Sequence, residues 1–342
     1  MGNTKTTIYD IAKLAGVSPA SVSRTVHHPN TVRKITRDKI WSAFGQLGVH
    51  PDDLSFKTSA KAAAPKGTVP HVPTVLLCMP GFQNPFYDEI LDGIQEQLRR
   101  ASYTLIVYGQ PLIHDSANHI LEVAASVGAD GLILTEQVSE DFLLKLNAYY
   151  PLVQCSEYNP ACRNIPYVTI DDYTITETAI RYLLKQGCQS IGFFSSPYQN
   201  RYVQNRYRAY KSVLTEAGFP IRSEYVLQVS DFSYERILSE ARRFFLLPQP
   251  PDGVFAVSDK HAHAVIKAAQ ALGFSVPKQV KVIGFDNTMY ATLSTPTITT
   301  IAQPGRMLGA ESANILIQKI SGRQTPAPVQ ILPAHLVFRE SV

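Results

Sequence analysis

Apolar and polar residues follow two different periods along this 342-residue chain. Between residues 75 and 284, short apolar runs typical of buried strands alternate with stretches that carry apolar side chains at helical spacing. We expect strands at 75–79, 105–108, 131–135, 168–170, 191–194, 225–228, 254–257 and 280–284, and helices at 86–101, 117–127, 174–186, 205–217, 234–247 and 261–272, with one more helix ending near residue 149. This order predicts parallel sheets with helices on both faces, and its two successive runs predict two similar lobes.

In residues 7–24 the apolar side chains follow only the helical spacing, without the short apolar runs of a strand. One face of a first helix would hold the apolar residues Ile8, Ile11, Ala12 and Ala15. A turn is expected at Gly16, and a second helix would follow with Ser18 as its cap and Pro19 at its first position. That helix would bury Val22 and Val26 and turn outward Ala20, Ser21, Ser23 and Arg24. Such a surface suits a helix that enters the DNA major groove, although an ordinary αα-hairpin shows the same pattern.

Positive charge is concentrated in the same part of the chain. Residues 1–70 hold seven Lys and three Arg against four Asp, whereas the whole chain has a net charge of only +4. Because phosphate contacts dominate nucleic-acid affinity, this distribution favours a DNA-binding head on a slightly acidic body. A solvated basic surface is the alternative interpretation.

Composition indicates a globular cytoplasmic protein with a large core, since 45% of the residues are hydrophobic. Cys78, Cys155, Cys162 and Cys188 form no C-x-x-C pair, so reduced thiols are expected. We find no signal peptide and no apolar run near the ~20 residues that a membrane helix needs. Residues 57–73 contain three prolines without any period, which predicts a linker.

The chain lacks the motifs of common catalytic sites, including G-x-S-x-G, G-x-x-x-x-G-K-[ST] and H-E-x-x-H. His261 and His263 would not share a helix face, so no metal site is expected. Asp171 and Asp172 could form a catalytic pair, but a strand-end acid and a helix N-cap explain them more simply. We therefore expect neither an enzyme nor a cofactor.

Several motifs resemble the lactose-repressor (LacI/GalR) family of bacterial transcription regulators. The sequence T-I-Y-D-I-A-K-L-A-G-V-S-P-A-S-V-S-R at 7–24 matches its N-terminal signature. Further matches, in family order, are T-R-D-K-I at 36–40, Q-L-G-V-H-P at 46–51, F-x-x-x-I-x-x-G-I at 86–94, D-G-L-I-L at 130–134, V-I-G-F-D-N at 282–287 and T-T-I-A-Q-P at 299–304. The resemblance implies an all-α helix-turn-helix head and an α/β sensor with the two lobes of a periplasmic-binding-protein-like fold.

The implied domains are a helix-turn-helix DNA-binding domain at 1–56, a linker or atypical hinge at 57–73, and an effector-binding and dimerisation domain at 74–342. Lobe 1 would span about 74–167 and 300–325, and lobe 2 about 168–299 and 326–342. The chain would cross between the lobes three times. The tail after residue 329 is too short for the coiled coil that makes tetramers in this family, so a homodimer is expected.

The resemblance also implies which residues contact a double-stranded DNA operator. Arg24 could pair bidentately with a guanine, whereas Pro19 and Ala20 offer only shape and methyl contacts. The full set of expected DNA contacts is Thr7, Tyr9, Ser18, Pro19, Ala20, Ser21, Ser23, Arg24, His27, Arg33 and Thr36. Helix capping is the alternative role for each Ser or Thr.

The expected hinge departs from the family pattern. Asp52 and Asp53 add negative charge near phosphates, and Ser55 and Thr58 stand where an Ala and a DNA-wedging Leu are usual. Because an apolar wedge helps to kink DNA, we expect a weak or absent hinge helix and weaker kinking.

Ligands of such folds bind at the carboxyl ends of the strands, between the lobes. The implied effector contacts are Asn84, Phe86, Tyr87, Ser156, Glu157, Arg206, Phe232, Ser258, Asp259, Asp286 and Gln303. Core packing is the alternative for the three aromatic residues, and a cap is the alternative for Asp286. Many sugar-responsive members carry Asp-Arg at the position of Ser156-Glu157, whereas the cytidine-repressor branch is similar to this chain here. The sequence thus favours a nucleoside effector, with a sugar as the alternative.

Together these features predict a cytoplasmic, homodimeric DNA-binding repressor controlled by a small molecule bound between two lobes. The alternatives are a ligand-binding protein of the same sensor fold without gene regulation, and an enzyme on an α/β scaffold.

Overall fold

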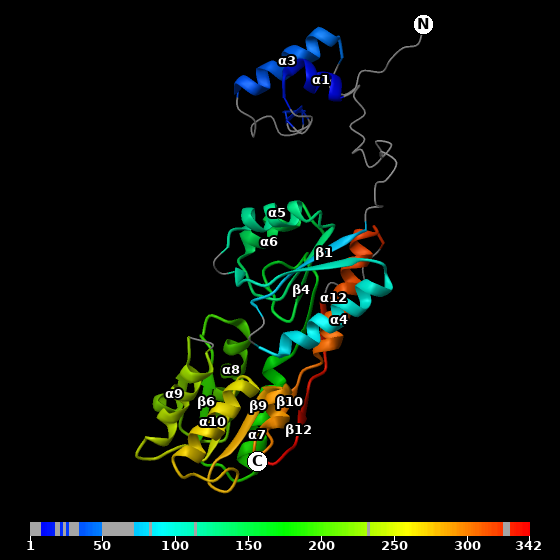
Figure 1. Ribbon diagram of the computed structural model, residues 1–342. Coiled ribbons are helices and arrows are strands. Elements are labelled where there is room, and N and C mark those ends of the chain that lie inside the picture. The colour runs from blue at the N-terminus through cyan, green and yellow to red at the C-terminus, as the bar shows by residue number, and fades with distance from the viewer. Residues whose placement is uncertain are drawn as a thin grey trace. The chain divides into compact units, whose positions relative to one another are not determined.

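The computed structural model describes residues 8–17, 21–22, 25–26, 34–49, 72–81, 84–112, 115–230, 233–323 and 329–342 (Figure 1). The expected hinge, including Asp52, Asp53, Ser55 and Thr58, and the expected linker up to residue 71 lie outside this described part. The chain divides into two compact units, residues 1–71 and residues 72–342, and each is described by itself.

The first unit contains α1 (Ile8–Ala15) and α3 (Lys34–Leu47), with helical backbone also at 21–22 and 25–26. Gly16 follows α1 with a φ of 65°, a left-handed conformation that glycine adopts without steric cost. The N–H of Val17 then donates to the carbonyl of Ala12 at 3.0 Å. A small core holds these helices together and consists of Ile11, Ala12, Val22, Ile40, Ala43 and Phe44.

The second unit contains two six-stranded sheets, A and B. Sheet A has the order β11-β5-β4-β3-β1-β2 with every pair parallel, and sheet B has the order β12-β10-β9-β8-β6-β7 with only β12 antiparallel. The strands of sheet A are β1 (Thr74–Cys78), β2 (Thr104–Tyr108), β3 (Gly131–Leu134), β4 (Leu152–Cys155), β5 (Tyr167–Ile170) and β11 (Val329–Leu332). Those of sheet B are β6 (Ile191–Ser195), β7 (Val226–Gln228), β8 (Gly253–Ala256), β9 (Lys281–Asp286), β10 (Thr299–Ala302) and β12 (His335–Val337).

Helices cover both faces of each sheet, as the alternating pattern predicted. On sheet A, α5 (Ala117–Ser126) and α6 (Glu140–Asn147) pack on one face, and α4 (Phe86–Arg100) and α12 (Gly305–Ile320) pack on the other (Figure 1). On sheet B, α7 (Asp172–Lys185) and α8 (Arg201–Glu216) lie on one face, and α9 (Tyr234–Phe245) and α10 (Asp259–Ala271) on the other. Short helices η4 (Ser223–Tyr225) and α11 (Met289–Leu293) complete the unit. We call sheet A with its helices lobe 1, and sheet B with its helices lobe 2.

Strand pairing corrects the expected lobe boundaries. β5 and β11 pair with each other in sheet A, so residues 168–170 and 329–332 belong to lobe 1 and not to lobe 2. β10 pairs with β9 in sheet B, so residues 300–302 belong to lobe 2. The described chain passes between the sheets after β5, after β10 and after β11, and α12 packs on lobe 1 as expected. An apolar strand pattern gives no information about which sheet the strand joins, and this explains the misplaced boundaries.

The helices α4 and α12 cross at two glycines. A Cβ at Gly93 would overlap the carbonyl of Arg306, and a Cβ at Gly309 would overlap the carbonyl of Ile90. Only glycine therefore permits these two backbones to approach this closely. None of the helices in the described ranges is long and apolar enough to cross a membrane.

Candidate functional site

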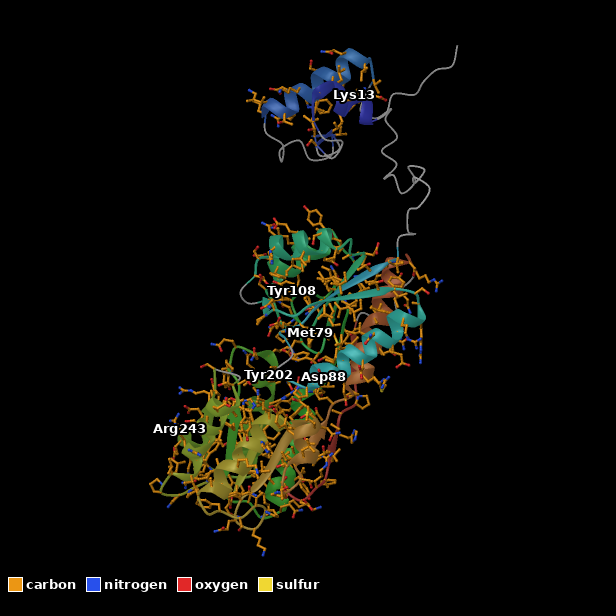
Figure 2. All side chains as sticks on the ribbon, in the orientation of Figure 1. Lys13, Met79, Asp88, Tyr108, Tyr202 and Arg243 are labelled. Atoms are coloured by element: carbon orange, nitrogen blue, oxygen red, sulfur yellow. The ribbon has the colours of Figure 1, made fainter. Side chains whose placement is uncertain are left out.

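Polar side chains gather where strands of both sheets end. Parallel strands place their carboxyl ends at one edge of a sheet, and ligands of open α/β sheets bind outside this edge. Ser156 and Glu157 follow β4, and Asp172 follows β5. In lobe 2, Asp286 ends β9 and Gln303 follows β10. Figure 2 shows Tyr202 of α8 and Asp88 of α4 close to the junction of the two lobes.

Arg201, the first residue of α8, joins the lobes through a buried ion pair. Its Nη2 donates to Oε1 of Glu157 at 3.0 Å and to Oδ2 of Asp172 at 3.2 Å. The guanidinium carbon lies 4.3 Å from the ring centroid of Tyr158, a cation–π geometry. Both Arg201 and Glu157 are only 9% exposed, so water screens this pair poorly.

Arg206, one turn further along α8, is engaged with groups of lobe 2. Its Nε and Nη2 donate to Oδ1 of Asp172 at 2.9 and 2.8 Å, and its Nη1 donates to the carbonyl of Val257 at 2.7 Å. The guanidinium carbon lies 3.3 Å from the ring centroid of Phe285. In this arrangement Arg206, the expected effector-binding arginine, uses most of its hydrogen-bond donors for contacts within the protein.

Asp286 forms a second polar cluster with two other predicted residues. Nε2 of Gln303 donates to its Oδ1 at 2.7 Å, and the side chain of Asn84, in lobe 1, also hydrogen-bonds to it. Asp286 has a φ of 103°, an uncommon conformation for a residue other than glycine. Burial raises its pKa to about 8, although the positive charge of Arg206 acts in the opposite direction. Burial likewise raises the pKa of Glu157 to about 7 against the effect of Arg201.

Aromatic residues stand beside these polar groups. Phe86 is buried, and its ring centroid lies 5.7 Å from that of Tyr87. Burial raises the pKa of Tyr87 well above its ordinary value, and the nearby Tyr202 and Glu157 add to this shift. A cavity of about 200 Å³ opens next to them, lined by Pro85, Phe86, Asp88, Glu89, Asp286, Asn287, Thr288 and Met289. This cavity touches both lobes.

Ser258 and Asp259 have structural partners. The Oγ of Ser258 accepts from the N–H of His261 and so caps α10. Asp259 is fully buried, and its two carboxylate oxygens accept from Thr300 Oγ1 at 2.5 Å and from the N–H of Thr288 at 2.6 Å. These contacts tie α10 to β10 and to the loop before α11, so in this arrangement Asp259 acts inside lobe 2.

Two histidines of α10 also have separate partners. Nδ1 of His261 lies 2.7 Å from Ser258 Oγ, and Nδ1 of His263 lies 2.7 Å from the hydroxyl of Tyr234. Burial lowers the pKa of His261 to about 3, which keeps its ring neutral.

Sequence reasoning missed Arg201, Asp172, Tyr202 and Phe285. The acids at 171 and 172 were expected to be a strand-end acid and an N-cap. Asp171 does cap α7, accepting from the N–H groups of Tyr173 and Thr174, but Asp172 is buried between two arginines. The helix expected to start at residue 205 begins at Arg201. A prediction with the correct start would have placed Arg201 and Arg206 on the same helix.

In the head, the structure describes only part of the expected DNA-binding set. Ser21 lies in helical backbone, and Thr36 lies in the first turn of α3 beside the exposed Lys34. The side chain of Tyr9 and the residues Thr7, Ser18, Pro19, Ala20, Ser23, Arg24, His27 and Arg33 lie outside the described part, as does Phe232 of the sensor.

Comparisons with known proteins agree with this two-unit architecture. Residues 7–52 match the family described as bacterial regulatory proteins, lacI family, and residues 180–342 match the periplasmic binding protein-like domain. Catabolite control protein A of Priestia megaterium is 29% identical over 337 residues, which cover 98% of both chains. The HTH-type transcriptional repressor CytR of Escherichia coli K12 is 27% identical over 340 residues, covering 99% of this chain and 96% of the relative.

Solved structures show the same likeness, one of them over nearly the full length of this chain. A complex of the transcriptional regulator CelR with cellobiose has a TM-score of 0.71 and 26% identity, covering 98% of this chain and 100% of the other. A LacI-type regulator from Bacillus cereus subsp. cytotoxis has a TM-score of 0.73 and 26% identity, covering 80% and 99%. Residues 7–52 and 180–342 thus match, in this order, the lacI-family regulatory domain and the periplasmic binding protein-like domain, and the chain is similar over nearly its full length to bacterial transcription regulators.

Proposed function

We propose that this regulator is a repressor whose operator affinity is controlled by a nucleoside or a sugar bound between lobes 1 and 2. The observation that supports this most directly is the set of charged and amide side chains that both lobes place at the carboxyl ends of their strands. Asn84 and Glu157 come from lobe 1, whereas Arg206, Asp286 and Gln303 come from lobe 2.

The chemistry of this set fits a polyhydroxylated ring. Carboxylate, amide and guanidinium groups exchange hydrogen bonds with vicinal hydroxyls, and Phe86, Tyr87 and Tyr202 offer aromatic faces. In the present arrangement several of these groups bind one another. An effector would therefore replace contacts that now join the lobes, and it would shift the lobe arrangement only by as much as it binds one arrangement better.

The two candidate effector classes come from different observations. The relative CytR and the Ser156-Glu157 sequence favour a nucleoside, whereas the CelR relative binds cellobiose in its solved complex. We place the nucleoside first because this chain lacks the Asp-Arg pair of many sugar-responsive members.

We further propose that two chains form a homodimer in the cytoplasm, so that two heads bind adjacent half-sites of a near-palindromic operator. Arg24 would supply most of the direct base recognition, and exposed lysines such as Lys13, Lys34 and Lys39 would attract the phosphates. The alternative is a ligand-binding protein of the same fold that regulates no gene.

A thermal-shift panel on the purified protein tests the effector. It contains cytidine, adenosine, uridine, inosine, free purine bases, ribose and common hexoses. A ligand at one hundred times its Kd should stabilise the protein by about 2.7 kcal/mol. Gln303→Ala should reduce the shift, whereas Lys145→Gln, at an exposed position of α6 in lobe 1, serves as the control. A shift with free sugars alone would reject the nucleoside.

A selection of genomic DNA fragments tests the regulatory role independently. The protein should retain fragments that share a near-palindromic site, and the effector found above should change their affinity. Ligand binding without any selected fragment would favour the alternative.

A further inference from the structure

The contacts of Arg201 cross from one lobe to the other. Its backbone belongs to α8 in lobe 2, but most polar partners of its guanidinium belong to lobe 1. Nη2 lies 3.0 Å from Glu157 Oε1 and 3.4 Å from both the Ser156 carbonyl and Thr169 Oγ1. The ring of Tyr158 beneath the guanidinium is itself stacked on Tyr167 of β5, with centroids 3.8 Å apart. One side chain of lobe 2 thus makes most of its polar contacts with lobe 1.

The same nitrogen also binds a carboxylate of its own lobe. Asp172 Oδ2 lies 3.2 Å from Nη2, and Asp172 is held in turn by Arg206, which donates to the Val257 carbonyl beyond β8. A continuous series of buried polar contacts therefore runs from Glu157 in lobe 1 through Arg201, Asp172 and Arg206 to sheet B. Pulling the lobes apart would break this series at the Glu157–Arg201 pair.

Arg201 also places a positive charge between two buried carboxylates. Glu157 and Asp172 come from different lobes, and one guanidinium donates to both. Without that shared positive charge, two buried carboxylates would face each other across the lobe boundary, where a low dielectric strengthens their repulsion. Glu157 Oε2 and Arg201 Nε are buried and have no hydrogen-bond partner in the described part of the chain. The pair is thus not satisfied by the protein alone, as expected of a contact that opens or accepts a ligand.

We propose that Arg201 is a tether between the lobes: its pairing with Glu157 holds lobe 1 against lobe 2 when no effector is bound. An effector that enters between the lobes would then act by replacing or completing this pair. The regulatory consequence rests on the proposed function, whereas the tether itself concerns the unliganded sensor.

The test measures the distance between the lobes without DNA or effector. Spin labels are attached at two exposed positions, one in each lobe: Lys145→Cys on α6 in lobe 1 and Arg243→Cys on α9 in lobe 2, the latter labelled in Figure 2. The four native cysteines are buried and should not react. Electron paramagnetic resonance of the full-length labelled protein should show a longer and broader distance distribution in Arg201→Met than in the parent.

A second arginine provides the matched control. Arg181 of α7 pairs with Glu177 and Glu216, both within lobe 2. Arg181→Met should leave the distance distribution unchanged, because its ion pairs do not cross between the lobes.

Two further variants separate the tether from general loss of stability. Glu157→Gln keeps the shape of the side chain but weakens the pairing, so it should lengthen the distance by less than Arg201→Met. The double variant Arg201→Met with Glu157→Gln should be more closed than Arg201→Met alone, because it removes the repulsion with Asp172. Distributions that stay unchanged in folded Arg201→Met and Glu157→Gln would overturn the tether. That failure would leave the repressor proposal intact, and failure to find an operator or effector would leave the tether intact.

Discussion

Asp172 and Arg206 form a buried ion pair in which Nε and Nη2 of the arginine both donate to Oδ1 of the aspartate, at 2.9 and 2.8 Å. Asp172 is 3% exposed and Arg206 is 4% exposed. Two neighbouring acids in the sequence thus have different functions, because Asp171 caps a helix in solvent and Asp172 neutralises buried arginines.

This difference predicts that the same substitution has a large effect on stability at one position and a small effect at the other. Asp172→Asn leaves two buried guanidinium groups without their shared carboxylate and should cost about 3–5 kcal/mol of unfolding free energy. Asp171→Asn should change it by only a few tenths of a kcal/mol, since Asn is also a good N-cap. Urea denaturation of both variants measures the difference. Equal losses would show that the buried pair contributes no more than the cap.

The raised pKa of Asp286 predicts how stability depends on pH. Burial raises this pKa to about 8, so up to that pH the native state keeps a proton that the unfolded carboxyl, with an ordinary value of 3.8, has lost. Unfolding free energy therefore falls as pH rises between about 4 and 8 through this group. Asp286→Asn should remove that loss, which is at most about 1.4 kcal/mol per pH unit.

The measurement is the difference in Tm between Asp286→Asn and the parent at pH 6 and at pH 8. The variant should gain relative stability at the higher pH. A difference that does not change with pH would mean that Asp286 is already ionised in the native protein at pH 6.

The crossing of α4 and α12 predicts a large effect of a single methyl group. Gly309→Ala would force a Cβ into the carbonyl of Ile90, so the helices must separate and the sensor should lose Tm. The control is Gly45→Ala in α3, which meets no atom within 4 Å and should gain up to about 1 kcal/mol from helix propensity. Calorimetry of the full chain resolves both changes. A sensor that tolerates Gly309→Ala would contradict the close backbone approach.

Arg24 and Lys34 should affect DNA binding in different ways. Arg24→Ala should cost about 1–3 kcal/mol of preference for the operator over unrelated DNA, because it would remove the proposed bidentate base contact. Lys34→Ala should weaken binding to both DNAs alike and reduce the salt dependence, as expected of a phosphate contact. Gel shifts on the operator and on a scrambled duplex at two salt concentrations distinguish the two. Equal losses of Arg24→Ala on both duplexes would argue against base recognition.

The hinge gives a prediction from the sequence alone. Thr58→Leu would place an apolar side chain at the position expected to wedge into DNA, so it should increase both operator affinity and DNA bending. Circular-permutation gel shifts measure the bend. An unchanged bend would mean that another residue or another protein supplies the kink.

Much of the fold could be predicted from local patterns. The helical face of Ile11 and Ala12, the turn at Gly16, and the alternation of strands and helices after residue 75 depend on side chains a few positions apart, and the structure has them. The strand β4, the helix α11 and the final strands β11 and β12 were not predicted, because they are short and their apolar content is interrupted. The helices α3 and α12 and the strand β10 were not predicted as elements either.

The amino-acid sequence by itself determined most of the secondary-structure order, the basic head and the resemblance to the lacI family, because periodicity, charge and motifs are properties of neighbouring residues. Only the tertiary structure decided that β5 and β11 complete sheet A, and that Arg201 meets Glu157 and Asp172, 44 and 29 positions away. Those contacts depend on which surfaces are buried together, and a buried charge selects its partner by proximity in space. The pairing of strands within each sheet, and the pairing of charges between the lobes, therefore follow only from the folded structure.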